Sequence, residues 1–85
     1  MAYLEDLTLY YKPTCPYCVK VLAYMQEQDI ECAMKNTMEP GVRDELINIG
    51  GKGQVPCLII SGSPLYESAD IIEYLHGLVA AEEIG

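Results

Sequence analysis

The sequence contains no tryptophan and no phenylalanine, so tyrosine is the only large aromatic residue available to a core. Seven tyrosines and the Ile, Leu, Val and Met side chains must therefore do the packing, and 51% of the residues are hydrophobic. That share supports a folded chain and argues against disorder. A chain of 85 residues is long enough for one compact core, so we predict a single domain over residues 1–85.

Positive charge is also scarce, because 5 Lys and Arg residues face 13 acidic ones and the formal net charge is −8. Nucleic acids and anionic membranes attract basic surfaces, so we expect neither as a partner. The basic residues are Lys12, Lys20, Lys35, Arg43 and Lys52.

Long apolar runs are missing as well. No stretch approaches the ~20 apolar residues that cross a bilayer. The first residues, MAYLEDLTLYY, lack the charged and apolar regions of a signal peptide. We therefore expect a cytoplasmic protein, in which structural disulfides are rare. We also expect a monomer, because no apolar stretch remains once a core is assigned.

Hydrophobic periodicity predicts an α/β domain with the element order βαβαββα. The strands are expected at residues 7–11, 30–36, 55–60 and 65–66, with a turn at 61–64. The helices are expected from Pro16 to about Gln28, from Val42 to Gly50, and after Ser68 as N-cap. The first βαβ unit should be parallel and the last two strands antiparallel, which gives a four-stranded mixed sheet.

Apolar side chains at regular spacing identify the expected core. The first helix repeats Val19, Leu22 and Met25, and the second repeats Val42, Leu46 and Ile49. The last helix repeats Ile71, Ile72, Leu75, Leu78 and Val79. Tyr10, Cys32 and Met34 are also predicted to be buried, and His76 is predicted to lie on the surface.

The stretch PTCPYCVK carries two cysteines, Cys15 and Cys18, at the start of the first expected helix. Unpaired backbone N–H groups and the helix dipole favour a thiolate at Cys15, and Lys12 adds a positive charge nearby. Cys18 lies one helical turn further on, within reach of Cys15 and expected to be more buried. The pair is therefore interpreted as a reactive dithiol, with Cys15 as nucleophile and Cys18 as resolving thiol.

Three other interpretations of these cysteines have less support. A zinc site needs a second close pair of ligands, and the remaining candidates Cys32, Cys57 and His76 are each isolated. Two structural disulfides are rare in the expected compartment. Cysteines that only fill a core do not explain a Cys-X-X-Cys beside a βαβ pattern, which is typical of a redox site. No metal is expected.

The motif CPYC, followed by QVPCL and then by LYESADIIEYL, resembles the glutaredoxin family over nearly the whole chain. The resemblance implies a thioredoxin-like fold with sheet order 2-1-3-4 and three flanking helices, and a cis bond between Val55 and Pro56. The Glu-Ser-Ala-Asp segment at residues 67–70 departs from many small glutaredoxins. It is instead similar to the N-terminal domain of glutathione transferases.

The resemblance also implies a groove for glutathione. The backbone of Val55, beside Pro56, would bind the tripeptide as an added strand. Ser68 and the last helix would bind the γ-glutamyl carboxylate, with Glu67 or Asp70 on the adjacent ammonium. Lys12 and Arg43 would pair with the glycyl carboxylate. Gln54 would add a hydrogen bond and Tyr17 would pack against the ligand, while Cys57 should point away from it.

These features predict a glutathione-dependent thiol–disulfide oxidoreductase that uses glutathione as reductant. The implied substrates are protein disulfides and protein–glutathione mixed disulfides, with ribonucleotide reductase as a candidate. Three alternatives remain open: a redoxin served by a thioredoxin reductase, a non-catalytic iron–sulfur carrier, and a transferase-like domain. The end of the sequence at Gly85, with no helical domain after it, counts against the last.

Overall fold

A computed structural model describes residues 2–84, with side chains for residues 4–80. The elements are β1 (Ala2–Tyr11), α1 (Pro16–Glu27), β2 (Ile30–Asn36), α2 (Val42–Gly50), β3 (Cys57–Ile60), β4 (Ser63–Tyr66) and α3 (Ser68–Ile84). The predicted order βαβαββα is confirmed. No helix in residues 2–84 is both long and apolar enough to cross a membrane.

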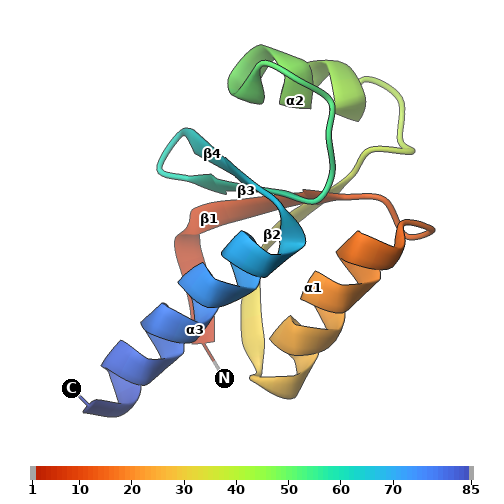
Figure 1. The fold of residues 1–85 in the computed structure, drawn as a ribbon. Coiled ribbons are helices and arrows are strands. Elements are labelled where there is room, and N and C mark those ends of the chain that lie inside the picture. Colours follow the sequence, from red (N-terminus) through yellow and green to blue (C-terminus); the bar gives the residue numbers. More distant parts are fainter. Residues whose placement is uncertain (1, 85) are drawn as a thin grey trace.

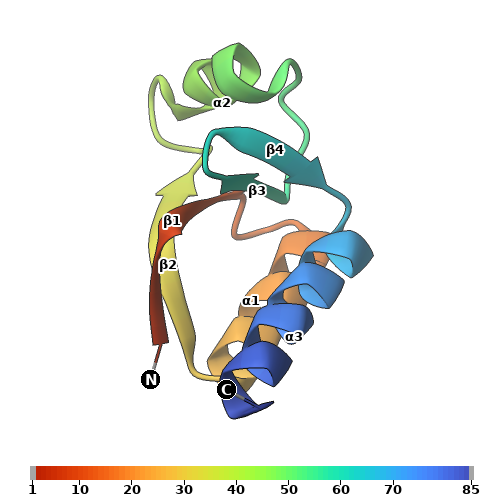
Figure 2. The same cartoon turned by 90° about the vertical axis from the view of Figure 1, so that its left-hand side faces the viewer.

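The four strands form one mixed sheet with the order β2-β1-β3-β4. Strand β1 is parallel to β2 and antiparallel to β3, and β4 is antiparallel to β3. Helices α1 and α3 lie side by side on one face of the sheet, and α2 lies on the opposite face (Figure 1 and Figure 2). This arrangement confirms the predicted thioredoxin-like fold.

Each face of the sheet has its own core, because side chains alternate between faces along a strand. Leu7, Leu9 and Leu58 pack with the buried side chains of α1 and α3. Tyr10, Cys57 and Ile59 pack with Leu46 of α2 on the other face. The prediction that Tyr10 is core is therefore confirmed, and Cys57 lies in the cluster on the α2 side of the sheet.

The starts of three strands, β1, β3 and β4, differ from the prediction. Strand β1 begins at Ala2 instead of Leu7, and its pairing with β2 is irregular between Leu4 and Thr8. The irregular segment contains two exposed acidic residues, which hide the strand from a search for alternating apolar residues. Strand β3 begins at Cys57, two positions after the expected start at Val55.

The turn between β3 and β4 is tighter than predicted. It contains only Ser61 and Gly62, with φ angles of 48° and 88°, and β4 starts at Ser63. Two central residues with positive φ give the turn type that suits a two-residue hairpin. Pro64 consequently lies within β4, where an edge strand tolerates a proline.

Three apolar residues predicted to be buried are exposed. Val19 is 50% exposed, and the buried stripe of α1 is formed by Cys18, Val21 and Met25 instead. Met34 is 43% exposed because only Ile30 and Cys32 of β2 reach the core. Ile49 is 42% exposed because α2 buries a single residue, Leu46. The predictions for Met25 and Cys32 are confirmed.

Polar contacts stabilise the packing of α2 on the sheet, next to the small apolar cluster around Leu46. The Tyr10 hydroxyl of β1 donates to Glu45 Oε1 of α2 at 2.7 Å, and Lys35 Nζ of β2 donates to the same oxygen at 2.6 Å. Burial and the Glu45 carboxylate raise the pKa of Tyr10 to about 12. The pKa of Glu45 is lowered by its hydrogen bonds from Lys35 and Tyr10.

Replacing Tyr10 by Phe should lower the free energy of unfolding by about 1 kcal/mol, the usual net worth of one hydrogen bond. Urea unfolding at neutral pH would measure the loss. Tyr24→Phe is the matched control, because the Tyr24 hydroxyl makes only an exposed 3.4 Å contact with His76 Nδ1. Equal losses in the two variants would contradict the role given to Tyr10.

The Tyr10 contribution should also depend on pH. The folded state favours the neutral phenol, since its pKa is raised to about 12. The contribution is therefore complete below the ordinary tyrosine pKa of ~10 and is lost as the pH rises through the folded value. The difference in unfolding free energy between the wild type and Tyr10→Phe should shrink over that range.

Candidate functional site

Cys15 is the N-cap of α1 and Pro16 is at the first position of the helix, as predicted. The Cys15 N–H donates to the Lys12 carbonyl at 3.0 Å, and the Cys15 carbonyl accepts the Val19 N–H at 3.0 Å. No side chain caps the helix, so its first N–H groups remain available to the Cys15 sulfur. Proline at the first helical position costs no hydrogen bond there.

The pKa of the Cys15 thiol is lowered from its ordinary value. The largest cause is the backbone N–H of Cys18, which favours the thiolate, and the backbone N–H of Tyr17, the Cys18 thiol and the charge of Lys12 act in the same direction. Desolvation opposes them and is outweighed. A half-buried thiol with a lowered pKa is the reactive type of cysteine.

Cys18 has the opposite character. Its side chain is 0% exposed, and burial raises the pKa of its thiol to about 11. The backbone N–H of Lys12 donates to Cys18 Sγ at 3.4 Å, which ties the loop before α1 to the helix. Each of the two thiols affects the pKa of the other, their pKa values are shifted in opposite directions, and both are free thiols.

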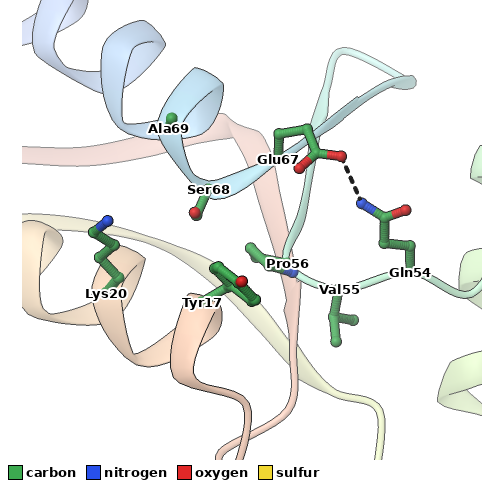
Figure 3. A pocket seen from close by; sticks show the side chains of 8 residues that line it. All are labelled: Tyr17, Lys20, Gln54, Val55, Pro56, Glu67, Ser68 and Ala69. Carbon is green, nitrogen blue, oxygen red and sulfur yellow. Dashed lines mark hydrogen bonds between the residues drawn. The ribbon is translucent and has the colours of Figure 1, made fainter.

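A cavity of about 590 Å³ lies between the start of α1, the segment before β3 and the start of α3 (Figure 3). Its lining residues are Tyr17, Lys20, Gln54, Val55, Pro56, Glu67, Ser68 and Ala69. The bond between Val55 and Pro56 is cis, as the resemblance implied. The volume is within the usual range for small-molecule sites.

The polar end of this cavity is formed where β4 passes into α3. Glu67 has a positive φ of 73° and precedes the helix, and its carbonyl accepts the Ile71 N–H at 3.0 Å. Ser68 is thus the first residue of α3 and not its N-cap, which corrects the prediction by one position. Glu67 Oε1 accepts Gln54 Nε2 at 3.1 Å.

A second hollow of about 480 Å³ lies on the other side of Val55, which lines both. Its other lining residues are Lys12, Thr37, Met38, Arg43 and Gly53. Arg43 lies against Gly53 so closely that a Cβ there would be 3.0 Å from Arg43 Nε. The lining holds two positive charges and no acidic residue, so this hollow suits an anion.

The structure brings the predicted groove residues together in these two adjoining hollows. Tyr17, Gln54, Pro56, Glu67 and Ser68 line the first, Lys12 and Arg43 line the second, and Val55 joins them. Of the two residues predicted for the ligand ammonium, Glu67 lines the cavity and Asp70 does not.

The sequence did not point to Lys20 and Ala69 in the larger cavity, nor to Thr37, Met38 and Gly53 in the smaller hollow. A signal for Lys20 was present, because it follows Tyr17 by three positions and so shares a face of α1 with it. Among the described residues, no group of three or more His, Cys, Asp and Glu side chains could hold a metal ion.

Comparison with known proteins gives one family. The model of the glutathione S-transferase N-terminal domain matches residues 9–83 of this chain. No curated protein sequence matches the chain significantly.

Solved structures resemble the chain in fold. The beta-etherase LigF from Sphingobium sp. strain SYK-6 is 30% identical, with a TM-score of 0.70, and the match covers 86% of this chain and 31% of that one. A glutathione S-transferase from the Antarctic clam Laternula elliptica is 26% identical, with a TM-score of 0.72 and coverage of 88% and 36%. The chain spans about a third of the transferase chains it matches.

Glutaredoxin C1 from Populus tremula x tremuloides also has the same fold. The match has a TM-score of 0.67 and covers 92% of this chain and 81% of that one. At 17% identity it demonstrates a shared fold and nothing further.

The lowered pKa of Cys15 predicts that iodoacetamide modifies this residue at pH values where an ordinary thiol is still protonated. The midpoint of alkylation rate against pH should lie below that of free cysteine, and Lys12→Gln should raise it. Lys52→Gln is the control, since Lys52 does not act on Cys15. A wild-type midpoint equal to that of free cysteine would contradict the electrostatic account.

Proposed function

The chain belongs to the glutathione S-transferase N-terminal domain family, and we propose that it acts as a glutathione-dependent thiol–disulfide oxidoreductase. The observation that carries the proposal is the unequal pair of neighbouring thiols, one with a lowered pKa and one buried with a raised pKa. A thiolate attacks disulfides, and a buried neutral thiol is protected until a mixed disulfide forms beside it.

Glutathione fits the charges of the two hollows. Its γ-glutamyl end carries an ammonium and a carboxylate, which match Glu67 and the start of α3 at Ser68 in the larger cavity. Its glycyl carboxylate matches Lys12 and Arg43 in the smaller hollow. Val55 lines both hollows, so its backbone is well placed to pair with the extended middle of the tripeptide.

In the proposed reaction, the Cys15 thiolate attacks the glutathione sulfur of a protein–glutathione mixed disulfide. The S–S bond to the substrate protein breaks, and the protein leaves as a thiolate that takes a proton from water. A new disulfide joins Cys15 to glutathione. Binding of the glutathione half selects which of the two sulfurs is attacked and aligns it with Cys15.

A second glutathione thiolate then attacks the bound glutathione sulfur. The products are oxidised glutathione and the Cys15 thiolate, which is a good leaving group because its pKa is lowered. For a disulfide within a substrate protein, Cys15 first forms a mixed disulfide with that protein. Cys18 then loses its proton and attacks Cys15, which releases the reduced protein and leaves a Cys15–Cys18 disulfide.

The proposed substrates are glutathionylated proteins and proteins whose disulfides recur in their catalytic cycle, among them ribonucleotide reductase. The scheme needs one copy of the chain and no metal. Its reducing equivalents come from glutathione.

The family match favours a second candidate, conjugation of glutathione to an electrophile by a transferase-type mechanism. The two candidates share the groove and differ in the role of the cysteines. Conjugation to an aryl halide would be followed by absorbance, and deglutathionylation by oxidation of NADPH through glutathione reductase. Conjugation that persists in Cys15→Ser would support the transferase candidate.

Cysteine variants test the oxidoreductase proposal. Cys15→Ser should reduce deglutathionylation of a glutathionylated protein to the uncatalysed rate, because it removes the attacking sulfur. Cys18→Ser should retain this activity and lose reduction of protein disulfides. Cys32→Ser, which alters a buried cysteine outside the site, is the control. Full deglutathionylation activity in Cys15→Ser would overturn the proposal.

A further inference from the structure

The scarce basic residues of this acidic chain have distinct surroundings. Lys35 is paired with Glu45 at 2.6 Å, and Lys52 Nζ lies 4.5 Å from the centre of the Tyr66 ring. Lys12 and Arg43 line the smaller hollow. Lys20 lines the larger cavity, and it has no salt bridge with any described residue. Lys20 is therefore the basic residue of that cavity, and its charge has no acidic partner among the described residues.

The position of Lys20 gives the larger cavity two oppositely charged ends. Figure 3 shows Lys20 on α1 at one side, Glu67 with its partner Gln54 at the other, and Ser68 between them. Lys20 and Glu67 are the charged residues that line the cavity. A ligand group with an anionic and a cationic end fits this order, and a group with one charge leaves either Lys20 or Glu67 without an opposite charge.

We propose that Lys20 is a specificity-determining residue that binds the α-carboxylate of the γ-glutamyl group together with the first N–H groups of α3. The α-ammonium of the same group then pairs with Glu67 at the opposite end. This inference rests on the proposed function, and it adds to the groove a residue from the dithiol helix itself. The Cys15 thiolate and one anchor of its co-substrate would then belong to a single rigid element.

The geometry of α1 supports this assignment. Lys20 follows Tyr17 by three positions, so both side chains project from the same face of the helix toward the cavity. Tyr17 is 64% exposed, which leaves its ring free to contact the ligand. Lysine carries its charge on a long flexible stem, so the ammonium can adjust to a carboxylate held at the start of α3.

Binding of three thioether ligands to the reduced protein tests the inference by calorimetry, because a methylated sulfur cannot exchange. The ligands are S-methylglutathione, its 4-aminobutanoyl analogue without the α-carboxylate, and its glutaryl analogue without the α-ammonium. The proteins are wild type, Lys20→Gln, Lys20→Arg and Lys52→Gln. Circular dichroism and urea unfolding would check that each variant folds.

Lys20→Gln should bind S-methylglutathione about tenfold more weakly, the effect of one charge-assisted hydrogen bond near solvent. In this variant, the ratio of the affinity for S-methylglutathione to the affinity for the 4-aminobutanoyl analogue should fall by the same factor. The corresponding ratio for the glutaryl analogue should not change. Lys20→Arg should retain most of the affinity, and Lys52→Gln should match the wild type.

The outcomes distinguish failure of the inference about Lys20 from failure of the proposed function. If Lys20→Gln keeps the wild-type preference for the α-carboxylate, the inference is overturned while the proposed function stands. If the preferences over both analogues fall together, Lys20 only shapes the cavity and the inference is also overturned. If wild-type protein does not bind S-methylglutathione, the proposed function fails and the inference fails with it.

Discussion

The attraction between a negative charge and the free N–H groups at a helix start governs this molecule at two places. At the start of α1 the charge is the protein's own, on Cys15, whose lowered pKa comes first from a backbone N–H. At the start of α3 the charge belongs to the proposed ligand, beside Ser68. Both helices lie on the same face of the sheet, and Tyr17 in the first turn of α1 and Ser68 at the start of α3 line one cavity.

The difference in charge between the acidic chain as a whole and the basic lining of the smaller hollow adds to this local effect. The chain has a formal net charge of −8, and yet the hollow lined by Lys12 and Arg43 contains no acidic side chain. An anionic ligand near this protein is repelled by most of the surface and attracted by the groove. The distribution of charge therefore restricts binding to one region without requiring a deep pocket. In the proposed binding mode, selectivity within that region depends on the order of charges along the groove.

Strong local signals in the sequence predicted the element order, whereas the sheet order and most of the lining residues were predicted from the resemblance to glutaredoxins. CPYC marks a helix start, and the turn residues separate well-defined apolar runs. The errors of prediction arose where tertiary contacts decide burial. Val19 and Val21 are equally apolar, and only the orientation of α1 on the sheet exposes the first and buries the second. Lys20 was missed because a lysine on a helix is normally a solvated surface residue, and only the neighbouring α3 places it at a cavity.

Because the Cys18 side chain is completely buried, Cys15 is the cysteine of the pair that is accessible from solvent. A disulfide arriving from solution meets the Cys15 sulfur first, because Cys18 is buried. In the proposed reaction, a protein disulfide is therefore joined to this chain through Cys15 alone. In the proposed reaction the later step is internal to the chain, and its rate depends on the geometry of the two cysteines and on the pKa of the departing thiol.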